Sequence, residues 1–305
     1  MVAVFLLTGC RRQLRAQERS PAIRVATGGE DGALVQALSQ TLQSYFPSQI
    51  QNVQNSLASN AGLVERSQVE LAIIPVNVAY LSYTQGWGDL PHPHSKLRGV
   101  AVLSTIPLFL VATERSGIRK LGDIRGKRVA VGTPDSTTQV TVRMTLEGLG
   151  LSLTDFDAQW LRSDVAVEDL RAGKVDAVFH RGNDPGSTVQ KLLKVPGAKV
   201  IPILRNESER IRSRHPFLHP ISIPAGMYGD HPGIATIGVD SLLVCRDDLP
   251  EELVYWITRA ISESLTSHPR STDVLRYIDA GQLHATPIPL HSGAARYYRE
   301  RELFE

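Results

Sequence analysis

The chain has 305 residues, more than one hydrophobic core usually serves, so two lobes are expected. Hydrophobic residues make up 42% of the chain and charged residues 21%, and the net charge of +2 comes from interspersed charges of both signs. This balance argues against a nucleic-acid-binding surface. No internal segment is long and apolar enough to predict a transmembrane helix.

A short apolar segment, residues 2–9, precedes Cys10 and a basic pair. The order Leu-Thr-Gly-Cys at its end is the one that the bacterial lipoprotein signal peptidase uses, and the segment falls short of the roughly 20 apolar residues that span a bilayer. We therefore expect Cys10 to be a lipidated N-terminus that anchors the protein in the periplasm or at the cell surface. An ordinary apolar N-terminus is the alternative, and the missing basic region before the segment indicates that translation starts further upstream. With Cys10 acylated, Cys245 has no disulfide partner and is expected to be a buried small hydrophobe.

Strands and helices alternate in the first part of the folded body, which follows a polar tether at residues 11–21. The expected elements are a strand at 23–27, a helix at 34–45, a strand at 49–54, a helix at 60–67, a strand at 69–74 and a helix at 78–85. Apolar residues at intervals of three and four predict the first helix, with Asp31 as its N-cap and Pro47 beyond its end. The alternation predicts βαβ units and a largely parallel sheet that is covered on both faces.

The second half of the chain suggests a second lobe inserted into the first. Apolar strands at 97–103 and 108–112 flank Pro107, and we place the crossing into the second lobe near Thr105. That lobe is expected to hold strands at 129–132, 159–161 and 175–179 and helices at 139–148 and 165–172. The chain is expected to return near 221–224, followed by strands within 234–244 and an amphipathic helix at 250–267. The resulting division is a tether at 1–21, lobe one at 22–105 plus 224–268, lobe two at 106–223, and a partly helical tail at 269–305. Two lobes joined by two crossings are typical of hinged binding proteins.

The strongest local feature is the loop from Thr27 to Gly32, Thr-Gly-Gly-Glu-Asp-Gly, between the first strand and the first helix. Glycines at such a junction let backbone N–H groups face a ligand at the positive end of the helix dipole. Adjacent glycines do not form the dinucleotide-binding pattern, and the two acidic residues would repel a pyrophosphate. Thr27, Gly28, Gly29 and Gly32 are therefore candidate contacts for a carboxylate or another polar ligand, and a plain glycine turn is the alternative.

A hydroxyl-rich loop at 131–138 repeats this arrangement in the second lobe. Its candidates are Thr133, Asp135, Ser136 and Thr137, which either present donors to an anion or cap the following helix. Two such loops, one in each lobe, can face each other across a cleft.

Four further residues are weaker candidates for the same cleft. Ser59 and Asn60 begin a helix, where capping explains them equally well, and Asn77 follows a strand whose carboxyl end opens toward the cleft. Tyr228 lies near the expected return crossing and either packs on the ligand or on the hinge.

Nothing in the sequence indicates catalysis or a bound metal. His92 and His94, like His215 and His219, are close in sequence, but prolines interrupt both pairs and no further ligand stands nearby, so loop histidines are the default. The chain has no Gly-x-Ser-x-Gly elbow, no P-loop and no His-Glu-x-x-His motif. We expect a protein that is not an enzyme and holds no cofactor.

Several motifs between about residues 22 and 268 together resemble the TAXI-type solute receptors of tripartite (TRAP) transporters. They are Thr27-Gly28-Gly29-x-x-Gly32, Ser59-Asn60-x-x-Leu63-Val64, Val69-Glu70-Leu71-Ala72, Leu97-Arg98-Gly99-Val100-Ala101, Ser116-Gly117-Ile118, Leu121-x-Asp123-Ile124-x-Gly126-Lys127, Gly173-Lys174-Val175-Asp176-Ala177, Ile223-Pro224-Ala225-Gly226-Met227-Tyr228 and Asp248-Leu249-Pro250-Glu251-Glu252-Leu253. The resemblance implies a type II periplasmic-binding-protein fold: a two-lobed α/β clamshell with mixed, mainly parallel sheets and a hinge.

The resemblance also implies a function: capture of a small, anionic organic solute, of the organic-acid or amino-acid class, for a TRAP membrane permease. The chain departs from the family pattern in both glycine loops. Residues 33–36 lack the usual two Tyr and Pro, and residues 135–138 replace the usual Gly-Ser-Gly-Thr. These changes indicate a solute other than the family's glutamate or 2-oxoglutarate, or a ligand-sensing or accessory domain of the same fold that does not serve transport.

Overall fold

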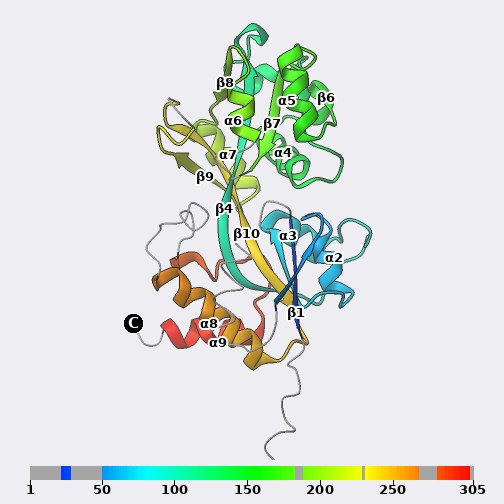
Figure 1. Ribbon diagram of the computed structural model, residues 1–305, viewed down its shortest axis with the longest axis vertical. Coiled ribbons are helices and arrows are strands. Elements are labelled where there is room, and N and C mark those ends of the chain that lie inside the picture. The colour runs from blue at the N-terminus through cyan, green and yellow to red at the C-terminus, as the bar shows by residue number, and fades with distance from the viewer. Residues whose placement is uncertain (1–21, 29–49, 183–187, 229–230, 268–279, 303–305) are drawn as a thin grey trace, which may run out of the picture.

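The computed structural model describes residues 22–28, 50–182, 188–228, 231–267 and 280–302. Two lobes stand one above the other and are joined by two long strands (Figure 1). Cys10, Gly29, Gly32 and the expected helix at 34–45 lie outside the described residues. No helix within the described ranges has the length and hydropathy to cross a membrane.

A single mixed sheet runs through both lobes. Its strands are β1 (Ile23–Thr27), β2 (Ile50–Gln54), β3 (Leu71–Pro75), β4 (Leu97–Thr113), β5 (Arg128–Ala130), β6 (Asp157–Gln159), β7 (Ala177–Arg181), β8 (Ala198–Ile201), β9 (Leu218–Ile223) and β10 (Ile234–Arg246). The strand order is β2-β1-β3-β10-β4-β7-β5-β6, with β8 beside β4 and β9 beside β10. β1 pairs in parallel with β2 and β3, and β5 with β6 and β7, whereas β4 and β10 are antiparallel to their neighbours. The predicted βαβ units are therefore present, one set in each lobe.

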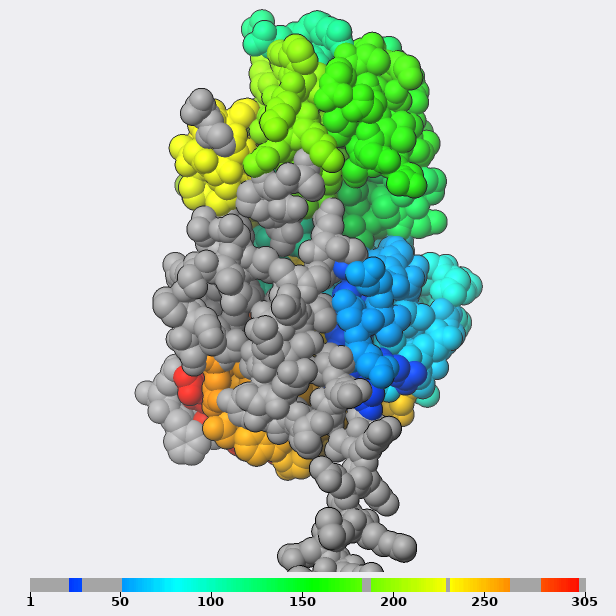
Figure 2. Space-filling view, in the orientation of Figure 1, coloured from blue at the N-terminus to red at the C-terminus, as the bar shows by residue number. Residues whose placement is uncertain are grey.

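Helices cover both faces of this sheet. They are α2 (Asn60–Glu65), α3 (Val76–Thr84), α4 (Thr137–Gly148), α5 (Ser163–Ala172), α6 (Thr188–Leu193), α7 (Arg205–Arg214), α8 (Glu251–Ser267) and α9 (Ser292–Glu302). One apolar core is continuous through both lobes and includes Ala79 of α3 and Val140 of α4. The opposite face has separate cores under α8 in lobe one and under α5 and α6 in lobe two. In the space-filling view, the green surface of lobe two adjoins the blue surface of lobe one (Figure 2).

The hinge consists of β4 and β10, which both extend from one lobe into the other (Figure 1). We predicted two strands around Pro107, but β4 is one strand of 17 residues. Pro107 faces Gly238 of β10, and β7 begins to pair with β4 only at Leu108. The missing N–H of Pro107 is tolerated because it falls at the end of the β4–β7 ladder, where the Pro107 carbonyl still accepts the N–H of Gly182 at 3.2 Å.

The chain returns to lobe one along β10, so the predicted crossing near 221–224 is wrong. Residues 218–223 form β9, which pairs with residues 234–239 of β10 and lies in the upper lobe (Figure 1). Further along, residues 241–245 of β10 pair with β3 of lobe one. The turn signal at Pro224-Ala225-Gly226 marks the hairpin between β9 and β10 and not a change of lobe.

The tail after residue 280 completes lobe one. α9 packs on α8, and Tyr255 of α8 donates a hydrogen bond to Glu300 at 2.7 Å. Ahead of α9, the N–H of Val102 donates to Leu283 at 2.8 Å, and Gly99 exchanges backbone hydrogen bonds with Pro289 and His291. These bonds cover the edge of β4 that faces away from β10, which would otherwise expose unpaired backbone groups.

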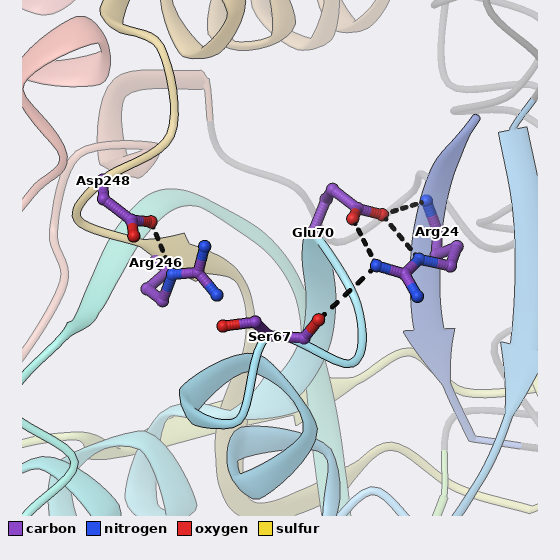
Figure 3. Close-up of polar contacts among 5 residues, drawn as sticks. All are labelled: Arg24, Ser67, Glu70, Arg246 and Asp248. Carbon is purple, nitrogen blue, oxygen red and sulfur yellow. Dashed lines mark hydrogen bonds and ion pairs between the residues drawn. The ribbon is translucent and has the colours of Figure 1, made fainter. Parts of the chain in front are cut away.

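Each lobe has the same arginine–carboxylate clip at the amino ends of its central parallel strands. In lobe one, Arg24 of β1 meets Glu70 before β3 with Nη2–Oε1 and Nε–Oε2 distances of 2.6 and 3.0 Å, and its backbone N–H donates to the same carboxylate (Figure 3). In lobe two, Arg128 of β5 meets Asp176 before β7 at 2.8 and 3.1 Å, again with its backbone N–H. The triplet Arg-Val-Ala occurs in both strands, at residues 24–26 of β1 and 128–130 of β5. The arginine–carboxylate pairs of β1 and β5 therefore follow one plan in both lobes.

Candidate functional site

A pocket of about 450 Å³ lies in lobe two where β5 and β6 end. Its lining residues are Gly132, Thr133, Ser136, Thr138, Leu161, Arg162, Ser163, Asp164 and Thr188. They come from the β5–α4 loop, the first turn of α4, the β6–α5 junction and the start of α6. The carboxyl ends of parallel strands are the usual ligand-binding edge of an α/β sheet.

The β5–α4 loop exposes donors because a glycine begins it. Gly132 has a φ of +87°, and a Cβ at this position would lie 2.8 Å from Oγ of Ser136. Ser136 caps α4, and its Oγ accepts the N–H of Gln139 at 3.2 Å. The N–H groups of Thr137 and Thr138 lie in the first turn of α4 and have no carbonyl partner within the helix. They are therefore available to a ligand at the positive end of the helix dipole.

The start of α5 forms the opposite wall of the pocket. Arg162 pairs with Asp164 at 3.3 Å, and both side chains are largely exposed. The N–H of Val165 and the charge of Arg162 hold the pKa of Asp164 below its usual value against the opposing effect of desolvation. The charges of this wall therefore balance, and the hydroxyl of Ser163 remains as a neutral donor.

Behind Ser163, the end of β7 contributes two buried basic side chains. His180 Nδ1 lies 3.5 Å from Oγ of Ser163. Burial, and then the neighbouring Arg181, lower the pKa of His180 to about 4, so its imidazole is neutral at pH 7. Arg181 is only 6% exposed and ends β7.

Of the residues predicted in this loop, Thr133 and Ser136 line the pocket. Asp135 is exposed, has a φ of +58° and does not line the pocket. Thr137 is not among the lining residues either, although Ser136 and Thr138 on both sides of it are. The sequence-based prediction missed Thr138, Arg162, Ser163 and Thr188. Ser163 was detectable as a hydroxyl before a helical pattern, but the expected helix began two residues later.

In lobe one, the described part of the first glycine loop is Thr27 and Gly28. Thr27 is fully buried, and its hydroxyl donates to Asn52 Oδ1 of β2 at 2.7 Å. Gly28 passes so close to Leu57 that a Cβ would lie 2.6 Å from its Cγ. Gly29 and Gly32 fall outside the described residues.

Three other predicted residues take part in local structure and packing. Asn60 is fully buried, and its side chain donates to the carbonyl of Ile73 at 3.2 Å, which ties α2 to β3. Ser59 occupies the N-cap position of α2 without a side-chain capping bond. Tyr228 packs edge-on against Phe109 at 5.5 Å between ring centroids, inside the core of lobe two. None of the three lines the pocket.

Asn77 connects the two lobes. Its Nδ2 donates to Oγ1 of Thr141 on α4 at 3.1 Å, and its Oδ1 accepts the N–H of Val78. Both side chains are fully buried. Asn77 therefore lies where the lobes meet, one turn along α4 from the hydroxyl-lined pocket.

The described residues contain no group of three or more His, Cys, Asp or Glu side chains that would hold a metal ion. The His215 and His219 side chains instead pair with Glu147 and Asp240, at 3.4 and 2.9 Å, on the other side of the hinge. Cys245 is buried as expected, and burial raises the pKa of its thiol far above the usual value.

Residues 25–301 match the NMT1-like family. The chain belongs to this family. Among solved structures it is similar to the periplasmic aliphatic sulphonate binding protein SsuA from Escherichia coli, with a TM-score of 0.55, 17% identity and coverage of 92% of this chain and 83% of that one. It is also similar to the alkanesulfonate-binding protein SsuA from Xanthomonas axonopodis pv. citri bound to MOPS, with a TM-score of 0.52, 16% identity and coverage of 94% and 93%.

A third similar structure is the substrate binding protein of an amino acid ABC transporter, with a TM-score of 0.51, 12% identity and coverage of 84% of this chain and 99% of that one. These likenesses confirm the predicted α/β fold with a mixed sheet, that of the periplasmic solute-binding proteins. The three neighbours are described as binding proteins.

Proposed function

We propose that this protein is an extracytoplasmic solute-binding protein that captures a small organic anion for a membrane permease. The observation that carries the proposal is the hydroxyl-lined pocket at the amino ends of α4 and α5 in lobe two. The fold shared with binding proteins supports it.

An anion is favoured because most polar groups that line the pocket are N–H and O–H hydrogen-bond donors. The first two N–H groups of α4 lack intrahelical acceptors, and the hydroxyls of Thr133, Ser136, Thr138 and Ser163 surround them. Asp164 is already engaged by Arg162. A volume of about 450 Å³ suits a small molecule, and a carboxylate or a sulfonate, as bound by the SsuA proteins, would satisfy these donors.

Capture would proceed by closure of the lobes on the solute. Lobe one would contribute the glycine loop with Gly28, Gly29 and Gly32, which follows the buried Thr27, and Asn77 would lie where the lobes meet. Asn77–Thr141 is a contact that closure would make or tighten. The closed shape is what the permease would recognise.

We further propose that the partner is a TRAP permease and that Cys10 carries the lipid anchor, on the motifs shared with TAXI receptors. A ligand-sensing or accessory role of the same fold is the second candidate, favoured by the two altered glycine loops. The neighbouring genes discriminate between the two: a permease with many membrane spans supports transport, and a histidine kinase or a cyclase supports sensing.

The test is a thermal-shift screen of the purified protein against carboxylates, amino acids and alkanesulfonates, with native mass spectrometry of freshly purified protein to find a retained solute. A solute at 100 times its Kd stabilises the folded state by about 2.7 kcal/mol. We expect Thr133→Ala and Ser136→Ala each to weaken binding about tenfold, because each removes a hydrogen bond to a charged group. Ser222→Ala is the matched control, since Ser222 is an exposed hydroxyl of the same lobe outside the pocket. No shift with any compound, or equal binding by all three variants, would refute the proposal.

A further inference from the structure

A larger cavity of about 1010 Å³ lies between the lobes, away from the hydroxyl-lined pocket. Its walls come from α3, β4, the ends of α4 and α7, β9, β10 and the tail segment 282–287. Helix α4 separates the two cavities: Ser136 at its N-cap lines the small pocket, and Glu147 near its end lines the large one. At 1.5 Å per residue these positions are about 16 Å apart. The cavity is therefore a separate place from the proposed solute site.

Most of the inner surface of the large cavity is apolar. Val76 and Tyr80 of α3 and Val102 and Leu103 of β4 line it from lobe one, and Phe217 lines it from lobe two. The rings of Tyr80 and Phe217 meet across the lobes, with centroids 5.4 Å apart. Apolar walls with a few polar groups, at about this volume, are typical of small-molecule sites.

The charged groups of the cavity are mostly paired with one another. Asp240 accepts hydrogen bonds from Thr105 Oγ1 at 2.6 Å and from His219 Nε2 at 2.9 Å. Glu147 lies 3.4 Å from His215 Nε2. Arg214, at the end of α7, is the one charged lining residue with no ion pair among the residues that the structure describes.

Charges of both signs act on His215, which lies between α4 and α7. Desolvation is the main cause that lowers its pKa, Glu147 opposes this effect, and the charges of Arg214 and Arg143 lower the pKa further. Arg214 is therefore the lining residue that can pair with an anion at the mouth of the apolar cavity.

We propose that this hinge cavity is a second small-molecule site, which binds an amphiphilic carboxylate. The apolar body of the ligand packs against the contacting rings of Tyr80 and Phe217, and its carboxylate pairs with Arg214. Binding there is non-covalent and does not depend on the identity of the solute held at α4 and α5. Because its walls belong to both lobes, the occupant stabilises the lobe arrangement in which the cavity exists.

Octanoate is the probe, and isothermal titration calorimetry of the full chain is the measurement. We expect one octanoate per chain and weaker binding of octylamine, which has the same apolar body with the opposite charge. Arg214→Gln weakens octanoate binding about tenfold, since it removes a charge-assisted hydrogen bond. Arg212→Gln is the matched control, because Arg212 is an exposed arginine of the same helix that does not line the cavity. Ala285→Trp, at an exposed tail position of the lining, fills the cavity and abolishes binding.

Any of the following results overturns the proposal: no octanoate binding at millimolar concentration, equal affinities of Arg214→Gln and Arg212→Gln, or octylamine binding as tightly as octanoate. Ser136→Ala separates this proposal from the solute site, because it leaves octanoate binding unchanged if the two cavities are distinct. If Ser136→Ala weakens octanoate binding as much as Arg214→Gln does, the probe occupies the solute site and the second site is refuted.

Discussion

Asp240→Asn tests whether one carboxylate holds the hinge together. Asp240 of β10 accepts from Thr105 of β4 and from His219 of β9, so it joins three strands where the chain passes between lobes. The amide keeps an acceptor for Thr105 but removes the charge that His219 uses. Hydrogen bonds to charged groups contribute about 1.5–3 kcal/mol, and the lower end applies because His219 and Asp240 are 33% and 24% exposed. We expect a loss of about 1.5 kcal/mol, which lowers Tm by about 3 °C in a chain of this size.

The loss should depend on pH in a defined direction. The hydrogen bond to Asp240, followed by its charge, raises the pKa of His219 above its usual value, against the opposing effect of burial. A raised pKa favours the protonated folded form, so the stabilisation is complete below the unfolded pKa of about 6.5 and is lost as pH rises through the folded value. The difference in Tm between wild type and Asp240→Asn should therefore be largest near pH 6 and shrink toward pH 9.

Differential scanning calorimetry between pH 6 and 9 measures this difference, and His219→Gln supplies the control. The double variant should lose little more than either single variant, because both remove the same contact. An equal Tm difference at pH 6 and pH 9, or additive losses in the double variant, would refute the assignment of the hinge contact.

Three further predictions concern single contacts. Glu70→Gln should lower the free energy of unfolding by about 1 kcal/mol at pH 7, because the pair with Arg24 is partly exposed. Partial burial opposes ionisation of Glu70, but the hydrogen bonds and charge of Arg24 outweigh it and lower the pKa of Glu70. The loss of stability should therefore vanish as pH falls from about 4 through that lowered pKa. The control Glu168→Gln, in an exposed helical pair, should change stability little at any pH. Gly132→Ala should destabilise by about 1–2 kcal/mol in urea titrations, because φ is +87° and Ser136 lies 2.8 Å from the new Cβ, whereas Gly122→Ala, which meets open space, should not. Tyr298→Phe should lose about 1 kcal/mol, because its hydroxyl donates to the carbonyl of Val100 at 3.0 Å, and an unchanged urea midpoint would contradict this role of the tail.

The sequence predicted the fold better than the site because the fold depends on local patterns. Alternating apolar strands and helices predicted the βαβ units of both lobes, and the spacing of Ile257, Ala260 and Ile261 predicted the buried face of α8. Pro107 was misleading, since a proline signal does not reveal that the residue falls at the end of a strand ladder inside a continuous strand. The return crossing was misplaced for a related reason: a turn signal marks a change of direction but not the lobe in which it occurs.

The candidate site could be predicted only where one loop supplies it. Thr133 and Ser136 follow directly from the β5–α4 junction, whereas Ser163 and Thr188 join them through the order of strands in the sheet, which no local pattern encodes. Residue type alone was a poor guide to exposure. Asn60 resembles a ligand-binding residue in sequence, but its amide donates to a strand carbonyl inside the core.

The two long strands of the hinge also affect how the protein unfolds. Since β4 and β10 each contribute paired residues to both lobes, neither lobe has a complete sheet without the other. The apolar core that includes α3 and α4 crosses the same boundary. A movement of one lobe relative to the other must therefore be accommodated by bending and twisting of these strands while their pairing persists. The same continuity couples the lobes during folding. A cut or a deletion of β4 or β10 in one lobe therefore also removes strand pairing from the other lobe.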